Sequence, residues 1–185
     1  MIRIIGGKYS GRKLKVPNGN NVRPTTDQVR EALFNMLSPM LNWDDTVVLD
    51  LYAGSGALGL EALSRGAKKA IFIEASRRHM AILKQNIEIF SPEKTKFELA
   101  QEKATKWISR FADPGQQCLT FLDPSFSSNE YNIILRKLAL TPAIRAGSLV
   151  VVESNRNREI SFPENMELLK HRRYGSVSLD ILRKY

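Results

Sequence analysis

The chain has 185 residues, of which 43% are hydrophobic and 25% charged, so its composition is that of a globular domain and not of a disordered or fibrous protein. A single cysteine, Cys118, excludes an internal disulfide and a cysteine-based metal cluster. The first residues lack the apolar core of a signal peptide, and no apolar run reaches the roughly 18 residues that a membrane-spanning helix needs. These properties predict one cytoplasmic domain over residues 1–185.

The positive charge of the chain is concentrated at its two ends. The 28 Lys and Arg exceed the 19 Asp and Glu, which gives a formal net charge of +9. Residues 1–30 carry seven Lys or Arg against one Asp, and residues 166–185 carry five against two acidic residues. Basic ends on a balanced middle indicate a polyanionic partner, either nucleic acid or an anionic membrane surface. The alternative is a charge that serves solubility alone.

Residues 1–40 are expected to form a short basic N-terminal extension and a helix. Two short strands at residues 3–5 and 13–16 flank a glycine-rich segment, which predicts a hairpin or an extended arm. A threonine after Pro24 can cap the helix that follows, and this helix should end before Pro39.

Strands and helices alternate from residue 46 onward. Apolar strands are expected at residues 46–52, 69–74, 96–100, 118–122 and 148–153, with helices at 56–64, 77–90, 104–111 and 131–140. Such strands are buried on both faces of a parallel sheet. The last segments, 168–174 and 177–182, read as a closing antiparallel hairpin. The predicted fold over residues 45–185 is therefore α/β: a doubly wound, mostly parallel seven-stranded sheet with a C-terminal antiparallel hairpin.

A glycine-rich turn follows the first strand of this sheet. Asp50 ends the strand, and Gly54, Ser55 and Gly56 lead into the next helix, where glycines let a ligand approach backbone N–H groups. Glu74 ends the second strand, and a carboxylate there can accept hydrogen bonds from both ribose hydroxyls. Together they predict a nucleoside cofactor; the alternative is a tight turn with a surface glutamate.

The residue before the glycines discriminates between cofactors. A carboxylate at Asp50 would repel the pyrophosphate of NAD but suits the ammonium group of S-adenosylmethionine. The chain also lacks the lysine pattern of a phosphate-binding loop, which disfavours nucleoside triphosphates. We therefore expect S-adenosylmethionine.

The fourth strand is followed by Asp123, Pro124, Ser125 and Phe126. A carboxylate and a backbone carbonyl at this point can accept hydrogen bonds from the amino group of a planar ring, while the aromatic side chain stacks on the ring. The alternative is turn chemistry, because Asp-Pro commonly opens a turn.

With these motifs, the chain resembles the seven-stranded S-adenosylmethionine-dependent methyltransferases. More narrowly, it resembles the bacterial family that methylates the N2 amino group of a guanine in 16S ribosomal RNA. The resemblance covers nearly the whole chain, and it is carried by the segments 4–8, 11–14, 23–26, 29–35, 50–59 and 60–67 together with Glu74, Asp123 and Pro124.

The resemblance implies a role for each matching residue. The cofactor, converted to S-adenosylhomocysteine, would be held by Asp50, Gly54, Ser55, Gly56, Glu74 and Ala104. The catalytic residues would be Asp123, Pro124 and Phe126. The RNA contacts would be Arg12, Lys13, Arg23 and Arg30. The implied partner is 16S rRNA or the assembling small ribosomal subunit, with no metal, no membrane and a monomeric enzyme. Methyl transfer would be direct.

Two positions depart from the pattern of that family. Ser125 stands where a second proline is usual, which should loosen the loop. Lys103 stands where an acidic residue usually precedes the alanine, so either Glu102 or a backbone group contacts the adenine, or the adenine is held mainly by shape. Three other functions stay open: a NAD-dependent oxidoreductase, a non-catalytic RNA-binding module, and an N-methyltransferase acting on DNA adenine or a protein glutamine.

Overall fold

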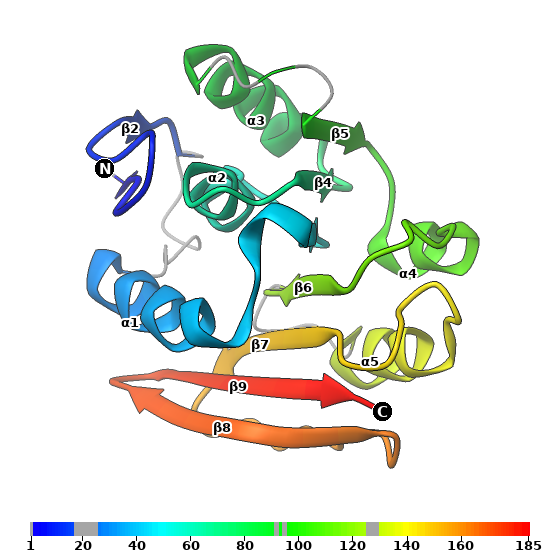
Figure 1. Cartoon of the computed structure of the whole chain (residues 1–185). Helices are drawn as coiled ribbons and strands as arrows, with labels where there is room; N and C mark the ends of the chain where they lie inside the picture. The colour runs from blue at the N-terminus through cyan, green and yellow to red at the C-terminus, as the bar shows by residue number, and fades with distance from the viewer. Residues whose placement is uncertain (1, 17–25, 91–92, 94–95, 125–129) are drawn as a thin grey trace.

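The computed structural model describes residues 2–16, 26–90, 93, 96–124 and 130–185. Its main sheet contains β3 (Val47–Asp50), β4 (Lys69–Ile73), β5 (Phe97–Ala100), β6 (Cys118–Leu122), β7 (Leu149–Asn155), β8 (Met166–Tyr174) and β9 (Val177–Lys184). These seven strands lie in the order β5-β4-β3-β6-β7-β9-β8 (Figure 1). The predicted mostly parallel seven-stranded sheet is confirmed.

The order of the strands creates a switch point in the middle of the sheet, between β3 and β6. Strands β3 to β7 pair in parallel, whereas β9 pairs antiparallel with both β7 and β8, as expected for the closing hairpin. The chain builds outward from β3 to β5 on one side and from β6 to β7 on the other. Because β3 and β6 are adjacent, their carboxyl ends flank the crevice where α/β sheets bind ligands.

Helices cover both faces of the sheet (Figure 1). They are α1 (Asp27–Leu37), α2 (Ala57–Ser64), α3 (Arg77–Phe90), α4 (Ala104–Trp107) and α5 (Glu130–Leu140). The first three pack in one hydrophobic core and the last two in a second. Consecutive residues of a strand, such as Val48 and Leu49, point into different cores. The helix expected over residues 104–111 is shorter, since α4 continues only as the 3-10 turn η4 (Ile108–Arg110).

The N-terminal extension forms a separate two-stranded sheet, β1 (Ile2–Arg3) with β2 (Lys13–Leu14). It is not a free arm, because its backbone is bonded to α2. The buried carboxylate of Glu61 accepts hydrogen bonds from the backbone N–H groups of Ile5 (2.7 Å) and Gly6 (2.9 Å). Residues 2–16 are therefore fixed to the helix that follows the glycine turn.

A glycine permits this close approach. At Gly7, φ is +76°, and an added Cβ would lie 1.9 Å from the carbonyl oxygen of Ser64, at the end of α2. The backbone N–H of Lys8 donates to that same oxygen at 2.7 Å.

No helix within the described ranges is long and apolar enough to cross a membrane.

Candidate active site

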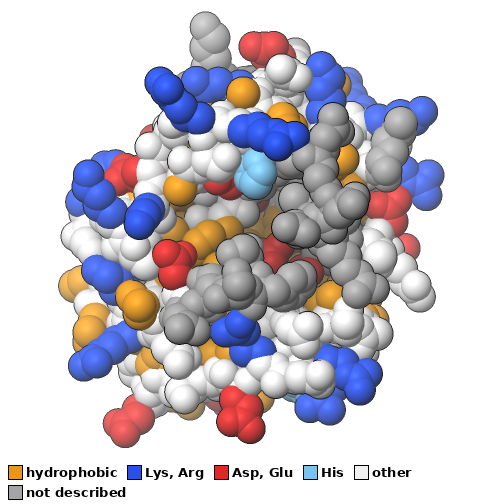
Figure 2. All heavy atoms as spheres, turned by 180° about the vertical axis from the view of Figure 1, so that it is seen from behind, with side chains coloured by type: hydrophobic (Ala, Val, Ile, Leu, Met, Phe, Trp, Pro, Cys, Tyr) orange, Lys and Arg blue, Asp and Glu red, His pale blue; other side chains and the backbone are white. Residues whose placement is uncertain are grey.

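Four carboxylates gather at the edge of the sheet where the parallel strands end. Asp50 ends β3, Glu74 follows β4 and Asp123 follows β6. The last residue of β6, Leu122, pairs with Val152 of β7, and Glu153 is the next residue of β7. Figure 2 shows Asp and Glu side chains deep in the middle of one face of the molecule, with Lys and Arg side chains around its margin. The structure thus brings the three acidic residues singled out in the sequence to one edge.

The glycine turn between β3 and α2 has one closed and one open position. At Gly56, φ is +81° and an added Cβ would lie 2.4 Å from a methyl group of Leu83, so packing excludes a side chain there. At Gly54, φ is +53°, and the nearest atom to an added Cβ is the carbonyl oxygen of Tyr52 at 3.9 Å. The space beside the Gly54 backbone is therefore open, which allows a ligand to approach it closely.

Glu74 is oriented by two backbone donors. One carboxylate oxygen accepts from the N–H of Gly54 at 2.9 Å and the other from the N–H of Ser76 at 2.7 Å. The side chain is largely buried. Since a carboxylate has about four acceptor positions, these two bonds fix the group and leave acceptor capacity for a ligand.

Asp50 is buried behind the glycine turn. One of its oxygens accepts a hydrogen bond from the backbone N–H of Gly59, in the first turn of α2, at 3.0 Å. The pKa of Asp50 is raised to about 7, mainly by burial and in smaller part by the nearby charge of Glu74, while the hydrogen bond from Gly59 acts to lower it. A cation bound beside Asp50 would therefore favour its charged form strongly.

Asp123 follows β6 at the switch point, two residues beyond Phe121, which pairs with Asp50 on the neighbouring strand. Removal from water raises the pKa of Asp123 well above its usual range, and the negative charges of Glu153 and Asp50 raise it further. An acid in such surroundings holds a proton more readily than an exposed one, a property suited to proton transfer. The predicted stacking residue Phe126 and the unusual Ser125 lie outside the described residues.

The carbonyl of Pro124 is held by α5. The hydroxyl of Tyr131 lies 3.2 Å from the carbonyl oxygen of Pro124 and 2.9 Å from that of Glu153. Tyr131, Pro124 and Glu153 are all buried. The guanidinium of Arg158 lies 5.1 Å from the centre of the Tyr131 ring. Tyr131 thus links the segment after β6 to β7.

The segment after β5, which was expected to contact the adenine, has its acidic side chain paired with an arginine. Ala104 is buried at the first position of α4, and Lys103 precedes it without forming a side-chain cap. The carboxylate of Glu102 is paired with Arg110, so it is directed toward that side chain. This pairing disfavours Glu102 as the adenine contact and leaves a backbone group or the shape of the site to hold the adenine.

The four predicted RNA-binding residues lie in different surroundings. Lys13 is exposed on β2. Arg12 is exposed but its guanidinium donates to the carbonyl oxygens of Ile89 (3.1 Å) and Phe90 (3.3 Å) at the end of α3. Arg23 lies outside the described residues.

Arg30 requires a correction. Its side chain is 1% exposed and donates to the carbonyl oxygen of Arg3 at 2.5 Å and to Asp27 at 2.9 Å. Burial also lowers the pKa of its guanidinium. We therefore replace the predicted phosphate contact by an internal one: Arg30 joins α1 to β1, because the helical spacing that places it on α1 also turns it inward.

The basic C-terminal hairpin reaches the edge that carries the carboxylates. Across β9, Leu179 pairs with Glu153 on one side and with Arg172 on the other, so Arg172 stands at the level of Glu153. Arg172 and Arg173 are exposed. Arg172 and Arg173 of this hairpin therefore lie at the same edge as Asp123, whereas Arg183 pairs with Leu149 at the start of β7, at the opposite edge.

Comparison with known proteins places the chain in a family. The family described as Conserved hypothetical protein 95 matches residues 2–183. Relatives from Haemophilus influenzae and Escherichia coli, both named Ribosomal RNA small subunit methyltransferase D, are each 35% identical to the chain. The alignments cover 96% of this chain and 91% of the first relative, and 99% of this chain and 90% of the second. The chain belongs to the methyltransferase D family.

Solved structures support the family membership. The structure of yhhF from Escherichia coli is 34% identical, has a TM-score of 0.86 and covers 99% of this chain and 97% of its own. TrmN from Thermus thermophilus, at 18% identity and a TM-score of 0.64, shares the fold alone. In this methyltransferase D family member, the Rossmann-like methyltransferase fold predicted from the sequence is therefore confirmed.

Three residues of this methyltransferase D site escaped the sequence analysis. Glu153 could have been noticed as an acidic residue at the end of an apolar strand. Tyr131 carried only the signal of an aromatic residue at the start of a helix. Asn86 is 0% exposed in the middle of α3 and bonds to the backbone of Lys15 and Ser55, contacts that no local pattern reveals.

Proposed function

We propose that this chain transfers a methyl group from S-adenosylmethionine to the exocyclic N2 amino group of a guanine in 16S ribosomal RNA. The observation that carries the proposal is the position of two carboxylates at the switch point: Asp50 ends β3 before the glycine turn, and Asp123 directly follows the adjacent strand β6. A cofactor site and an amine-binding site are thereby neighbours. The names of the curated relatives support small-subunit ribosomal RNA as the substrate.

The residues around the glycine turn fit the proposed cofactor. The open space beside Gly54 admits a ligand, and the oriented carboxylate of Glu74 can accept from ribose hydroxyls. Asp50 supplies the negative charge that an ammonium group requires, with Ser55 and Gly56 completing the turn and Ala104 facing the adenine end. The cofactor brings a methyl group on a positively charged sulfur, which needs no activation by the protein.

Asp123 and Pro124 would bind the amino group of the target guanine. The amino nitrogen carries two N–H bonds, and the two acceptors offered here are the Asp123 carboxylate and the Pro124 carbonyl. That carbonyl already receives the Tyr131 hydroxyl at 3.2 Å, but a carbonyl oxygen has two lone pairs and can accept a second bond. Phe126 would stack on the base.

These acceptors would favour the transition state over the substrate. The lone pair of the amino nitrogen is conjugated with the guanine ring, and acceptance of both N–H bonds favours the pyramidal nitrogen that attacks. Positive charge then develops on this nitrogen, and Asp123 would hold the departing proton because its surroundings raise its pKa.

The substrate side of the proposal rests on charge. Guanine N2 is accessible when the base is unpaired or flipped out of a helix. Lys13, Arg12 and Arg23 at one end of the chain and Arg172 at the other would contact phosphates. We further propose that the whole chain is one methyltransferase domain, acting in the cytoplasm as a monomer on 16S rRNA or on the assembling small subunit.

The experiment that tests the proposal uses labelled S-adenosylmethionine with 16S rRNA, both as free RNA and as small-subunit particles from cells that lack the enzyme. Wild-type protein should incorporate label, and mass spectrometry of the digested RNA should identify N2-methylguanosine. Asp123→Asn keeps the shape but removes the charge, so turnover should fall about 100-fold. Cofactor binding, measured by calorimetry, should remain within about twofold. Glu31→Gln, at an exposed carboxylate of α1, is the matched control.

Each other result identifies a different function. A methylated adenine or a methylated protein glutamine would move the target to another amine. RNA and cofactor binding without incorporation would indicate a binding module. Tight NADH binding without S-adenosylmethionine binding would indicate an oxidoreductase, and unchanged turnover of Asp123→Asn would contradict the role of Asp123.

A further inference from the structure

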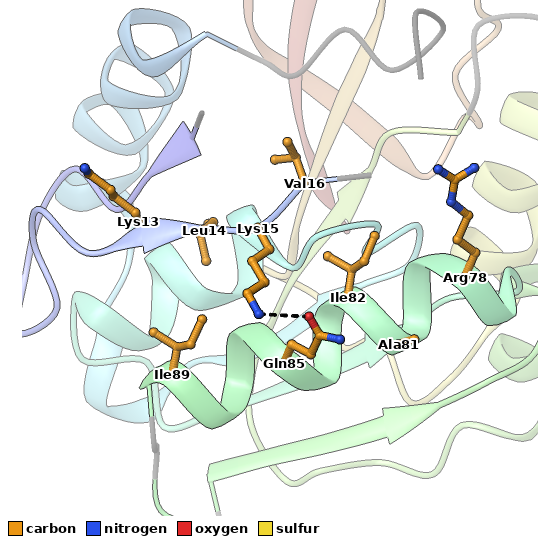
Figure 3. A pocket seen from close by; sticks show the side chains of 9 residues that line it. All are labelled: Lys13, Leu14, Lys15, Val16, Arg78, Ala81, Ile82, Gln85 and Ile89. Atoms are coloured by element: carbon orange, nitrogen blue, oxygen red, sulfur yellow. Dashed lines mark hydrogen bonds between the residues drawn. The ribbon is translucent and has the colours of Figure 1, made fainter. Parts of the chain in front are cut away.

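A groove lies between the N-terminal extension and α3, outside the candidate active site (Figure 3). It has a volume of about 800 Å³, within the roughly 300–1,000 Å³ range of sites that bind small molecules. One side is formed by residues 13–16 of the extension, and the other by α3 residues that include Ile82, Gln85 and Ile89. No proposed cofactor or base contact lines it, and Lys13 is the one proposed phosphate contact among its lining residues.

The floor of the groove is apolar. Ile82, Gln85 and Ile89 follow each other at intervals of three and four residues, so they share one face of α3. Ile89 is 44% exposed, one of the five large hydrophobic residues exposed in the described part of the chain. Leu14 and Val16 of the extension also line the groove, and Figure 3 shows the Leu14 side chain pointing toward α3. Apolar surface that stays open in this way often marks a binding site.

The charged groups of the groove all have the same sign. Lys13 and Lys15 lie along the extension and Arg78 lies at the other end of the groove, while none of its nine lining residues is acidic. The ammonium group of Lys15 reaches across to the side-chain oxygen of Gln85, at 3.1 Å (Figure 3). A ligand that combines an apolar ring with a negative charge matches this lining.

The groove begins near the candidate active site and leads away from it. Arg78 stands four residues after Glu74, at the start of α3, and Ile89 is eleven residues further along the helix. At about 1.5 Å per residue, the α3 side of the groove extends for roughly 16 Å. An RNA strand whose target base lies at Asp123 could therefore place a nearby nucleotide in the groove.

We propose that this groove binds an unpaired nucleotide of the RNA substrate, close in the chain to the methylated one. The base would pack on Ile82 and Ile89, with the Gln85 amide available to its edge, and its phosphate would lie beside Lys15, whose side chain points toward α3. This inference rests on the proposed function, since it assumes that RNA is the substrate. It adds a contact that helps to select the RNA and takes no part in the chemistry.

One buried side chain holds the groove in a fixed shape. Asn86 is completely buried, accepts a hydrogen bond from the Lys15 N–H (2.8 Å) and donates to the Lys15 carbonyl (2.9 Å). The same amide nitrogen donates to the carbonyl of Ser55 in the glycine turn at 2.8 Å. The extension is thus tied both to α3 and to the turn, so the groove is preformed and the cost of ordering it is already met by folding.

The test compares two groove variants with two matched controls. Ile82→Trp fills the groove, and Ile133→Trp places the same residue on the exposed face of α5. Lys15→Glu reverses a charge of the groove, and Lys84→Glu reverses an exposed charge on another face of α3. The readouts are the Kd of a fluorescent single-stranded fragment of 16S rRNA and the KM for RNA in methyl transfer. Melting temperatures identify any variant that fails to fold.

Both groove variants should weaken RNA binding about tenfold and raise the KM for RNA, with little change in the Kd of S-adenosylmethionine. Both controls should match wild type. RNA carrying 4-thiouridine should cross-link to peptides containing residues 13–16 or 78–89. Unchanged RNA affinity in both folded groove variants would overturn the inference. Cross-links from these positions in small-subunit particles to a ribosomal protein instead of RNA would overturn it as well.

Failure of the proposed function has a different signature. In that case, wild-type protein would transfer no methyl group to any RNA tested. The groove would still be judged by RNA affinity alone, because the binding measurement does not depend on the reaction.

Discussion

The hydroxyl of Tyr131 lies 2.9 Å from the carbonyl oxygen of Glu153 and 3.2 Å from that of Pro124, so a single side chain of α5 joins the ends of β6 and β7. Tyr131→Phe removes this hydroxyl and little else. If the Pro124 carbonyl binds the target base, its position becomes less defined, and turnover should fall about fivefold for the loss of roughly 1 kcal/mol.

The check on Tyr131 is a pair of measurements on one sample. Steady-state methyl transfer gives kcat, and calorimetry gives the Kd of S-adenosylmethionine, which should not change. Tyr185→Phe removes the hydroxyl of an exposed tyrosine beyond the end of β9, at the opposite edge of the sheet, and serves as control. A variant with full kcat would show that the positioning of Pro124 does not limit the reaction.

Cofactor binding should tighten as the pH rises. Burial raises the pKa of Asp50 to about 7, so the group is largely protonated at pH 6 and largely charged at pH 8. A cationic ligand prefers the charged form, and its Kd should therefore fall about tenfold between pH 6 and pH 8. Binding at pH 7 should also release a proton, which calorimetry detects by repeating the titration in buffers with different ionisation enthalpies.

Two controls separate Asp50 from the other carboxylates at this edge. Asp50→Asn should bind the cofactor weakly and without this pH dependence. Adenosine, which carries no positive charge, should bind the wild-type protein with similar affinity at both pH values. A wild-type Kd for S-adenosylmethionine that stays constant over this range would contradict the pairing with Asp50.

Glu74→Gln should weaken the cofactor by about tenfold or more. The two oxygens of Glu74 accept from the N–H groups of Gly54 and Ser76, and an amide can satisfy only one of them. Its NH₂ group would face the other donor, which disturbs the turn and removes charge from the ribose contact. Fluorescence or calorimetric titration measures the effect, and equal affinity for both proteins would remove Glu74 from the site.

Lys13 and Arg30 should behave differently toward RNA although both were expected to bind it. Lys13 is exposed, so Lys13→Ala should weaken RNA binding. It should also reduce the steepness of the slope of log K against log salt concentration by about one. Arg30 is 1% exposed, and Arg30→Met should leave both quantities unchanged. An equal loss of slope in the two variants would show that Arg30 meets RNA after all.

The main sheet was predictable because its signals are local. Apolar runs such as residues 118–122 are buried on both faces, and the turn chemistry around Gly54 marks the point where a strand passes into a helix. Asp50, Glu74 and Asp123 were also accessible, since the carboxyl ends of parallel strands must meet at one edge. The family resemblance carried the finer assignments.

The rest depends on contacts between distant segments. The sequence places Arg30 on a helix but does not say that this face meets Arg3. Nothing near Asn86 announces that its amide bonds to Lys15 and Ser55, residues 71 and 31 positions away. The raised pKa of Asp123 follows from its burial beside Glu153, which exists only once β6 and β7 are paired.

The attachment of the N-terminal extension decides how its role can be studied. The carboxylate of Glu61 is completely buried, and it is paired with Arg65 and with the backbone of Ile5 and Gly6. Deleting residues 1–16 would leave this carboxylate without two of its donors and uncover apolar surface on α2 and α3. A truncated protein would therefore lose stability and RNA affinity together, and only single substitutions such as Lys15→Glu can separate recognition of RNA from the integrity of the enzyme.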